Sequence, residues 1–164
     1  MIEVRAKVVI PRTVWPNDSR AISSALEGMG RALLPDLQNA SPVGDPLDDP
    51  HSGLLRASWQ QRTEVAKDRG SLIFENTARD QWGYYPYWVH EGTGVYGSYG
   101  QPIRPIRAQY MVFRWKGKRR RMRMVRGQPG QKFLVKFFEA VAAKLPKVAY
   151  ESFANAMRRF NRGP

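Results

Sequence analysis

One segment, residues 85–94, constrains the fold of this chain more than any other. Its sequence, YPYWVHEGTG, places three large aromatic side chains and a histidine directly before two glycines. Aromatic side chains bury large areas, and glycine accepts the positive φ angles that other residues avoid. We therefore expect a short helix from Tyr85 to Glu91 that packs against a core and is stopped by Gly92. We expect Gly92 and Gly94 to serve backbone geometry at a sharp turn.

The residues before this segment predict a strand, a helix and a hairpin. Residues 2–10 alternate between apolar and charged side chains, as a half-buried strand does. Residues 18–38 carry an apolar stripe at helical spacing, with Asn17 or Asp18 as the cap and Pro35 as a point where the helix kinks or ends. Residues 59–66 and 71–77 predict paired strands, joined by a turn over residues 67–70 that ends in glycine. The stripe consists of Ile22, Leu26, Met29, Leu33 and Leu37.

The residues after this segment predict a second hairpin and a helical region. Residues 109–115 and 121–126 alternate as strands, with Met111, Phe113 and Trp115 on one face and residues 116–120 at the tip. Residues 131–161 predict a long helical region in which Pro146 causes a kink or separates two abutting helices. Its expected apolar stripe consists of Leu134, Phe138, Val141, Leu145 and Val148.

Together these elements predict a single α+β domain over residues 1–164. We expect a mostly antiparallel sheet, an N-terminal helix and a long, proline-kinked C-terminal helical region. Long loops are expected at about residues 39–53 and 95–108, with a basic hairpin at about residues 109–126. The length of 164 residues is typical of one domain.

Charge is distributed very unevenly along the chain. The net charge is +13, but residues 104–164 hold 17 Lys/Arg against two Glu, whereas residues 1–103 hold 10 Lys/Arg against 12 Asp/Glu. Such asymmetry indicates that the second part meets an acidic partner, either nucleic acid or an acidic protein face, or else forms a solvated face.

The basic residues are densest in the second hairpin, beside Trp115. Three uses fit them: tracking phosphates, docking onto acidic protein with arginine forks, or a solvated tip. The sequence leaves these alternatives open. The candidate electrostatic contacts are Lys116, Lys118, Arg119, Arg120, Arg121 and Arg123.

Three segments partly match known cofactor or metal motifs, but each lacks a residue or a structural context that the motif requires. Residues 92–97 match the dinucleotide pattern G-x-G-x-x-G but do not lead from a strand into a helix. His90-Glu91 lacks the second histidine of a zinc-protease motif, because Gly94 holds that position. The aspartates of residues 41–53 lack the spacing of a calcium loop. We therefore expect no catalytic residue, no cofactor, no metal site and no enzyme activity.

The composition also bears on the compartment. The chain has no cysteine, and no apolar run approaches the ~20 residues that span a bilayer. Its first residues alternate in polarity and lack the apolar block of a signal peptide. We expect a soluble protein that is made in the cytoplasm and has no membrane partner.

Three short motifs, in this order, resemble a phage protein family. Residues 52–58, SGLLRAS, resemble its small-hydroxyl, Gly, x, Leu, Arg, x, Ser motif, and residues 87–93, YWVHEGT, resemble its segment that ends in Gly-Thr. Residues 130–134, GQKFL, resemble its entry into the C-terminal helix. The family comprises the tail-completion or neck proteins, also called minor tail components, of long-tailed double-stranded DNA phages. The loop at residues 95–107 and the heavy basic hairpin depart from its pattern.

The resemblance implies a structural protein of the virion, made in the host cytoplasm and located at the head–tail junction. Such a protein forms a ring, hexameric or alternatively dodecameric, that joins the tail to the head connector and continues the DNA conduit. Its neighbours would be head-connector, tail-terminator or tail-tube proteins, with double-stranded DNA in the channel. The alternatives are a free basic nucleic-acid-binding module and a tail-assembly chaperone absent from the particle.

The ring would need two different patches on each subunit, for which the loop at residues 95–107 and the terminal segments are candidates. The motifs and the glycine turn mark a set of structural or interface residues. This set consists of Gly53, Leu55, Arg56, Tyr87, Trp88, Gly92, Thr93, Gly94, Phe133 and Leu134.

Overall fold

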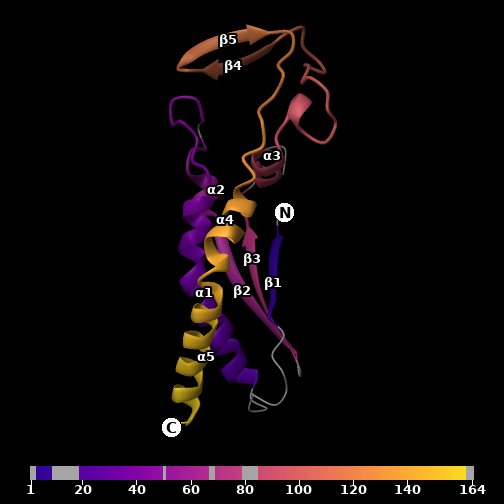
Figure 1. Ribbon diagram of the computed structural model, residues 1–164. Helices are drawn as coiled ribbons and strands as arrows, with labels where there is room; N and C mark the ends of the chain where they lie inside the picture. The colour runs from indigo at the N-terminus through magenta and orange to yellow at the C-terminus, as the bar shows by residue number, and fades with distance from the viewer. Residues whose placement is uncertain (1–2, 9–18, 50, 67–68, 79–84, 162–164) are drawn as a thin grey trace.

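A computed structural model gives the protein as an elongated α+β molecule (Figure 1). It describes residues 3–8, 19–49, 51–66, 69–78 and 85–161. Helices and a three-stranded sheet form a body at one end, and a two-stranded hairpin lies at the end opposite the C-terminus. The elements are β1 (Glu3–Val8), α1 (Ser19–Ala40), α2 (Leu54–Ala57), β2 (Trp59–Ala66), β3 (Arg69–Asn76), α3 (Tyr85–Glu91), the 3₁₀ helix η2 (Gly94–Tyr96), β4 (Met111–Trp115), β5 (Lys118–Met122), α4 (Phe133–Ala142) and α5 (Leu145–Asn161).

The body is built on an antiparallel sheet of order β1-β3-β2. Helices α1 and α4 bury their apolar sides against this sheet, and α5 packs along α1. The apolar stripe predicted for residues 18–38 is confirmed: Leu26, Met29, Leu33 and Leu37 are buried, and Ile22 packs beside them. The rest of the buried cluster is Leu55, Trp59, Leu72, Phe74, Phe133, Phe137 and Val141.

Helix α1 runs further than the sequence predicts. It continues to Ala40, so residues 39–40 are helical rather than loop, and Pro35 lies inside it. Proline costs about 3 kcal/mol within a helix because a hydrogen bond is lost. Here Leu33 and Leu37, on either side of Pro35, are both buried, and their packing holds the helix together. The predicted cap at Asn17 or Asp18 lies outside the described residues.

The first hairpin has a tighter connection than predicted. Ala66 pairs with Arg69, so only residues 67–68 lie between the strands and Gly70 belongs to β3. Gly70 is buried, and a Cβ there would lie 2.5 Å from Leu26 Cδ1. The glycine therefore makes room for α1 above the sheet and does not close the turn.

The C-terminal region consists of two abutting helices, one of the two arrangements expected at Pro146. The break falls at residues 143–144, and Pro146 is the second residue of α5. The first turn of a helix has no intrahelical acceptor for its N–H groups, so proline costs little there.

The apolar stripe predicted for the C-terminal region is confirmed except at Phe138, because Val141 is buried and Leu134, Leu145 and Val148 pack against the core. Phe133, Phe137 and Val141 are buried, whereas Phe138 is 47% exposed and Leu134 is only partly buried. Stripes that begin at Phe133 and at Leu134 both continue at steps of three or four residues, so spacing alone could not choose between them. Edge-on packing of Phe133 against Trp59 and of Phe137 against Phe74 accompanies the observed orientation of α4.

The turn of the basic hairpin is shorter than predicted, which changes the pairing of its two strands. Trp115 pairs with Lys118, so the turn is only Lys116-Gly117, with φ angles of 51° and 70°. Two-residue turns with positive φ match the twist of paired strands. Lys118, Arg119 and Arg120 therefore lie in β5 rather than at the tip, and the strand ends at Met122 instead of Arg126.

Candidate basic interaction surface

The basic hairpin is joined to the body through two backbone segments that pair with each other. Thr93 N–H donates to Gln128 O at 2.9 Å, and Val95 N–H donates to Arg126 O at 2.8 Å. Further along, Ile103 and Val125 exchange both backbone hydrogen bonds. The hairpin is thus carried on a paired connection rather than on two separate linkers.

Gly92 and Gly94 shape this connection, as their spacing predicts. Their φ angles are 98° and 63°, a region that side chains disfavour. A Cβ on Gly92 would lie 2.7 Å from Gly130 N, and one on Gly94 would lie 2.2 Å from Arg126 O. Both positions require glycine because of conformation and because another backbone passes close by.

The tip of the hairpin is held by the loop that follows α1. The Asp48 carboxylate accepts hydrogen bonds from Lys116 N–H at 2.6 Å and Gly117 N–H at 2.8 Å. Asp49 accepts from the Tyr85 hydroxyl at 3.1 Å. These aspartates support the backbone and α3, and no cluster that could hold a metal occurs among the described residues.

The strand register divides the hairpin into two faces. Paired residues lie on the same side of a sheet, and neighbours along a strand alternate between sides. The mixed face consists of Met111, Phe113, Trp115, Lys118, Arg120 and Met122. The arginine face consists of Val112, Arg114, Arg119 and Arg121, together with Tyr110 and Arg123, which contact each other beyond the strand ends.

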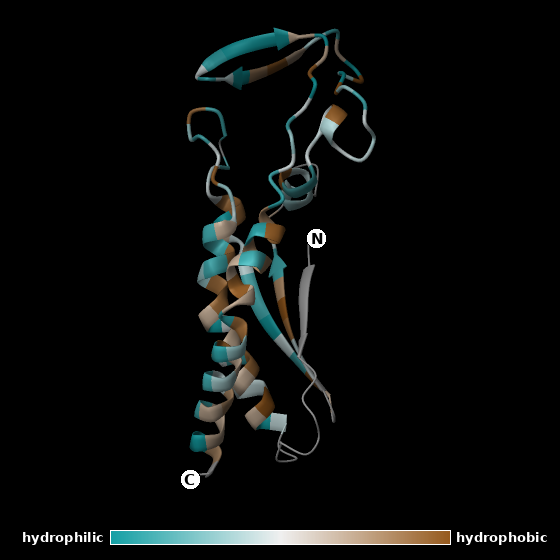
Figure 2. Ribbon diagram, in the orientation of Figure 1, coloured by the Kyte–Doolittle hydropathy of each residue, from teal (hydrophilic) through white to brown (hydrophobic). Residues whose placement is uncertain are grey.

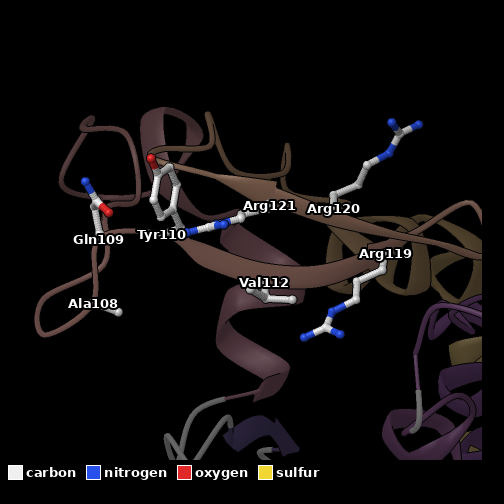
Figure 3. Close-up of a pocket in the computed structure, with 7 residues that line it drawn as sticks. All are labelled: Ala108, Gln109, Tyr110, Val112, Arg119, Arg120 and Arg121. Carbon is white, nitrogen blue, oxygen red and sulfur yellow. The ribbon is translucent and has the colours of Figure 1, made fainter.

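The arginine face is ordered by Tyr110. The Arg121 guanidinium carbon lies 3.9 Å from the centre of the Tyr110 ring, and Arg123 Nη2 donates to the Tyr110 hydroxyl at 3.4 Å. Stacking of this kind contributes about 0.5–1 kcal/mol at an exposed site. In Figure 3, Val112 and Arg119 project to one side of the ribbon and Arg120 to the other.

The hairpin is exposed on both sides. Every residue of β5 is exposed, its ribbon is hydrophilic along most of its length in Figure 2, and Trp115 and Val112 of β4 are also exposed. No basic residue between Arg104 and Arg126 forms an ion pair with a carboxylate of the described chain. Residues 92–138 contain no Asp or Glu at all. The six candidate electrostatic residues are therefore brought together with their cations unpaired.

The motif residues predicted as structural or interface positions fall into a buried and a surface group. Leu55 and Phe133 are 1% exposed and lie in the core, and Gly92 is buried as well. These three residues stabilise the fold of the subunit, and they are not accessible to a neighbouring protein. Leu134 packs at the margin of the core.

The remaining motif residues lie at or near the surface. Gly53 precedes α2 in a left-handed conformation, and Arg56 is exposed, with Nη2 at 3.4 Å from Ser41 O. Tyr87 and Trp88 pack edge-on with ring centres 5.4 Å apart at the outside of α3. The Thr93 hydroxyl accepts from Gln128 N–H at 3.0 Å.

A polar cluster lies where α3 meets the start of α4. Glu91 bonds to Lys132, and its second carboxylate oxygen lies 2.8 Å from His90 Nδ1. These two hydrogen bonds, that of Lys132 first, hold the pKa of Glu91 below its ordinary value. The His90 ring packs edge-on against Phe133 at 5.2 Å between ring centres. His90 is thus a packed, partly buried histidine.

Sequence reasoning missed three residues that shape the surface. Arg114 alternates with Val112 and shares the arginine face, a placement that the period-two pattern already implied. Tyr110 lies within the strand predicted for residues 109–115, but only the fold brings it against Arg121. Asp48 lies 68 residues from Lys116, so no local pattern could connect them.

No protein-family model, curated protein or solved structure matches this chain. Within the described part of the chain, no helix is long and apolar enough to cross a membrane.

Proposed function

We propose that this chain is a structural virion protein of the head–tail junction of a long-tailed double-stranded DNA phage. Copies would form a ring that joins the tail to the head connector and continues the DNA conduit. Six copies are proposed, with twelve as the alternative. The neighbours would be head-connector, tail-terminator or tail-tube proteins, and the proposal assigns the chain no catalysis and no cofactor.

The convergence of the three family-like motifs carries this proposal. They lie far apart in the sequence, yet Gln131 N–H donates to Val89 O at 3.0 Å and Lys132 N–H donates to His90 O at 3.2 Å. Phe133 and Leu55 share one buried cluster. These contacts bring parts of all three motifs together within one subunit, which supports the proposal.

The shape and the exposed side chains support an assembling subunit. The loop predicted as a ring contact exposes Tyr99 at 83% and Ile106 at 98%, with Ile103 also exposed. Exposed apolar side chains grouped on one loop suit a protein contact. A closed ring needs two different patches on each subunit, and this loop would supply one of them.

Mass spectrometry of purified particles tests the proposal. The chain should be present at a fixed copy number close to that of other single-ring components. Absence from the particle, with normal production in the cell, would contradict the proposal and favour an assembly chaperone.

The exposed, unpaired basic hairpin also favours a second candidate, a nucleic-acid-binding module that acts free in the cell. Absence from particles together with tight DNA binding would support that candidate. Both functions use the same hairpin, so the location of the protein separates them.

A further inference from the structure

The arginine face differs from the mixed face in chemistry as well as in position. The mixed face carries Met111, Phe113 and Trp115 beside its two cations, a composition typical of protein contacts. The arginine face offers only Val112 and Tyr110 as apolar groups, and the Tyr110 ring is stacked against Arg121. The two faces therefore suit different partners.

The guanidinium groups of the arginine face are arranged for phosphates. Arginine binds phosphate oxygens through paired N–H donors, which makes it the preferred residue for this contact. Arg119 and Arg121 leave the same side of β5 two residues apart, about 6.6 Å along a strand. Arg123 follows them and is held by Tyr110. The Arg121 and Arg123 guanidiniums thus gather at the Tyr110 ring, Arg119 precedes them on the same face, and none of the three is paired to a carboxylate in the described chain.

A duplex fits this face better than an acidic protein does. Arginine is common at protein interfaces, but there it stands among few other charges, whereas this face is charged across its centre. The major groove of B-DNA, about 12 Å wide, admits a two-stranded β-ribbon such as β4–β5. The six residues of the face include no Asn or Gln to read adenine. Its arginines can contact guanine as well as phosphate, but phosphates are the contact that every duplex sequence offers.

We infer that the arginine face of the β4–β5 hairpin binds the phosphate backbone of double-stranded DNA without sequence preference. That the arginine face lies in a DNA conduit rests on the proposed function, whereas the binding of this face to DNA does not. Asp48 stabilises the turn that presents the face, because its carboxylate accepts from backbone N–H groups and leaves the guanidiniums free.

The test compares two pairs of substitutions that remove equal charge from opposite faces. Arg119→Gln with Arg121→Gln alters the arginine face, and Lys118→Gln with Arg120→Gln alters the mixed face of the same strand. The full chain is titrated into a labelled random-sequence duplex, and fluorescence anisotropy is recorded at several salt concentrations. Circular dichroism and thermal unfolding check that each variant is folded.

The arginine-face pair should weaken binding by about tenfold or more near 0.1 M salt, and the log–log salt slope should fall by about 1.8 for two lost phosphate contacts. The mixed-face pair should weaken binding by no more than about threefold, since screening limits its effect at a distance. Arg119→Lys with Arg121→Lys keeps the charge and should retain most of the salt slope. If the glutamine variants misfold, the binding of the unaltered protein to duplex DNA and to polyglutamate at the same salt still tests the inference.

Equal loss from the two glutamine pairs would overturn the assignment to one face. Failure of the unaltered protein to bind duplex DNA, or tighter binding to polyglutamate at the same salt, would overturn the inference in favour of an acidic protein partner. Particle mass spectrometry separates this result from the proposed function. If the protein is present in particles but does not bind DNA, the proposed function stands and the inference is wrong. If it binds DNA but is absent from particles, the proposed function is wrong and only the DNA-binding module remains.

Discussion

The body and the basic hairpin of this molecule are stabilised in different ways. In the body, α1, α4 and the three-stranded sheet enclose one apolar cluster that includes Phe74 and Phe137. The hairpin has no such cluster, and both of its sides face solvent in the isolated subunit. It is held at its base by paired backbone and at its turn by Asp48.

The stability of the protein therefore comes from the body, and the hairpin is available for recognition. An isolated two-stranded hairpin is marginally stable in water. A charged one also repels itself, because Lys118, Arg119, Arg120 and Arg121 are consecutive. We interpret the hairpin as a contact element that a partner covers on assembly. The body, in contrast, folds on its own apolar contacts.

The largest effect is expected from two neighbouring phenylalanines in α4. Phe137 is 2% exposed and packs edge-on against Phe74, whereas Phe138 is 47% exposed. Phe137→Ala should lower the free energy of unfolding by about 3–5 kcal/mol, the usual range for a buried phenylalanine. Phe138→Ala, the matched control, should cost about 1 kcal/mol or less, as exposed substitutions do. Urea denaturation measures both, and equal costs would contradict the orientation of α4.

The next effect concerns the connection between body and hairpin. Gly92→Val should destabilise the protein by about 1–3 kcal/mol, because valine would be strained at a φ of 98° and would meet the backbone of Gly130. Gly100→Val is the control, since that residue has a φ of 61° but nothing within 4 Å of its Cβ. The midpoint temperature of thermal unfolding should fall further for Gly92→Val than for Gly100→Val. Unchanged unfolding with lost nucleotide binding would instead favour a cofactor site.

A smaller, local effect is expected at the hairpin turn. Asp48→Ala removes the acceptor of the Lys116 and Gly117 N–H groups. Each such hydrogen bond contributes about 1 kcal/mol net, so the turn should open more often while the body stays intact. Hydrogen exchange should speed up at these two amides and remain unchanged in α1. Asp45→Ala is the control, because Asp45 accepts from Leu47 N–H within its own loop.

The smallest effect is a pH dependence carried by Glu91. Its pKa is lowered in the folded protein by the hydrogen bonds from Lys132 and then His90. A lowered folded pKa gives stability that is present above the unfolded pKa and is lost as the pH falls through the folded value. The contribution is limited to under about 1 kcal/mol because the carboxylate is 38% exposed and screened.

An NMR titration of the Glu91 carboxyl checks this pH dependence. In Lys132→Met the pKa of Glu91 should rise toward its ordinary value, and acid unfolding should lose part of its steepness below pH 5. An unchanged pKa in this variant would show that Lys132 is not the main cause of the shift.

Local patterns in the sequence predicted most of the elements of this fold. The period of Ile22, Leu26 and Met29 identified α1, and the aromatic segment before Gly92 identified α3 with its boundaries. These predictions succeeded because spacing and glycine chemistry act within a few residues. The α+β class followed from the order of the elements.

The errors arose where distant contacts decide between local alternatives. Phe137 and Phe138 belong to equally regular stripes, and only packing against Phe74 distinguishes them. The positive φ of Lys116, which moved the hairpin turn, accompanies hydrogen bonds to Asp48 from a loop 68 residues away. The candidate surface was predicted as a run of cations, but its division into two faces depended on that register.

Hydrogen exchange can show whether the body folds by itself and the hairpin is completed by a partner. The amides of β4 and β5 should exchange quickly in the isolated protein and slowly in purified particles, while those of α1 and β3 exchange slowly in both. Equal protection of the hairpin in the two states, or hairpin amides as slow as those of β3 in the isolated protein, would contradict it.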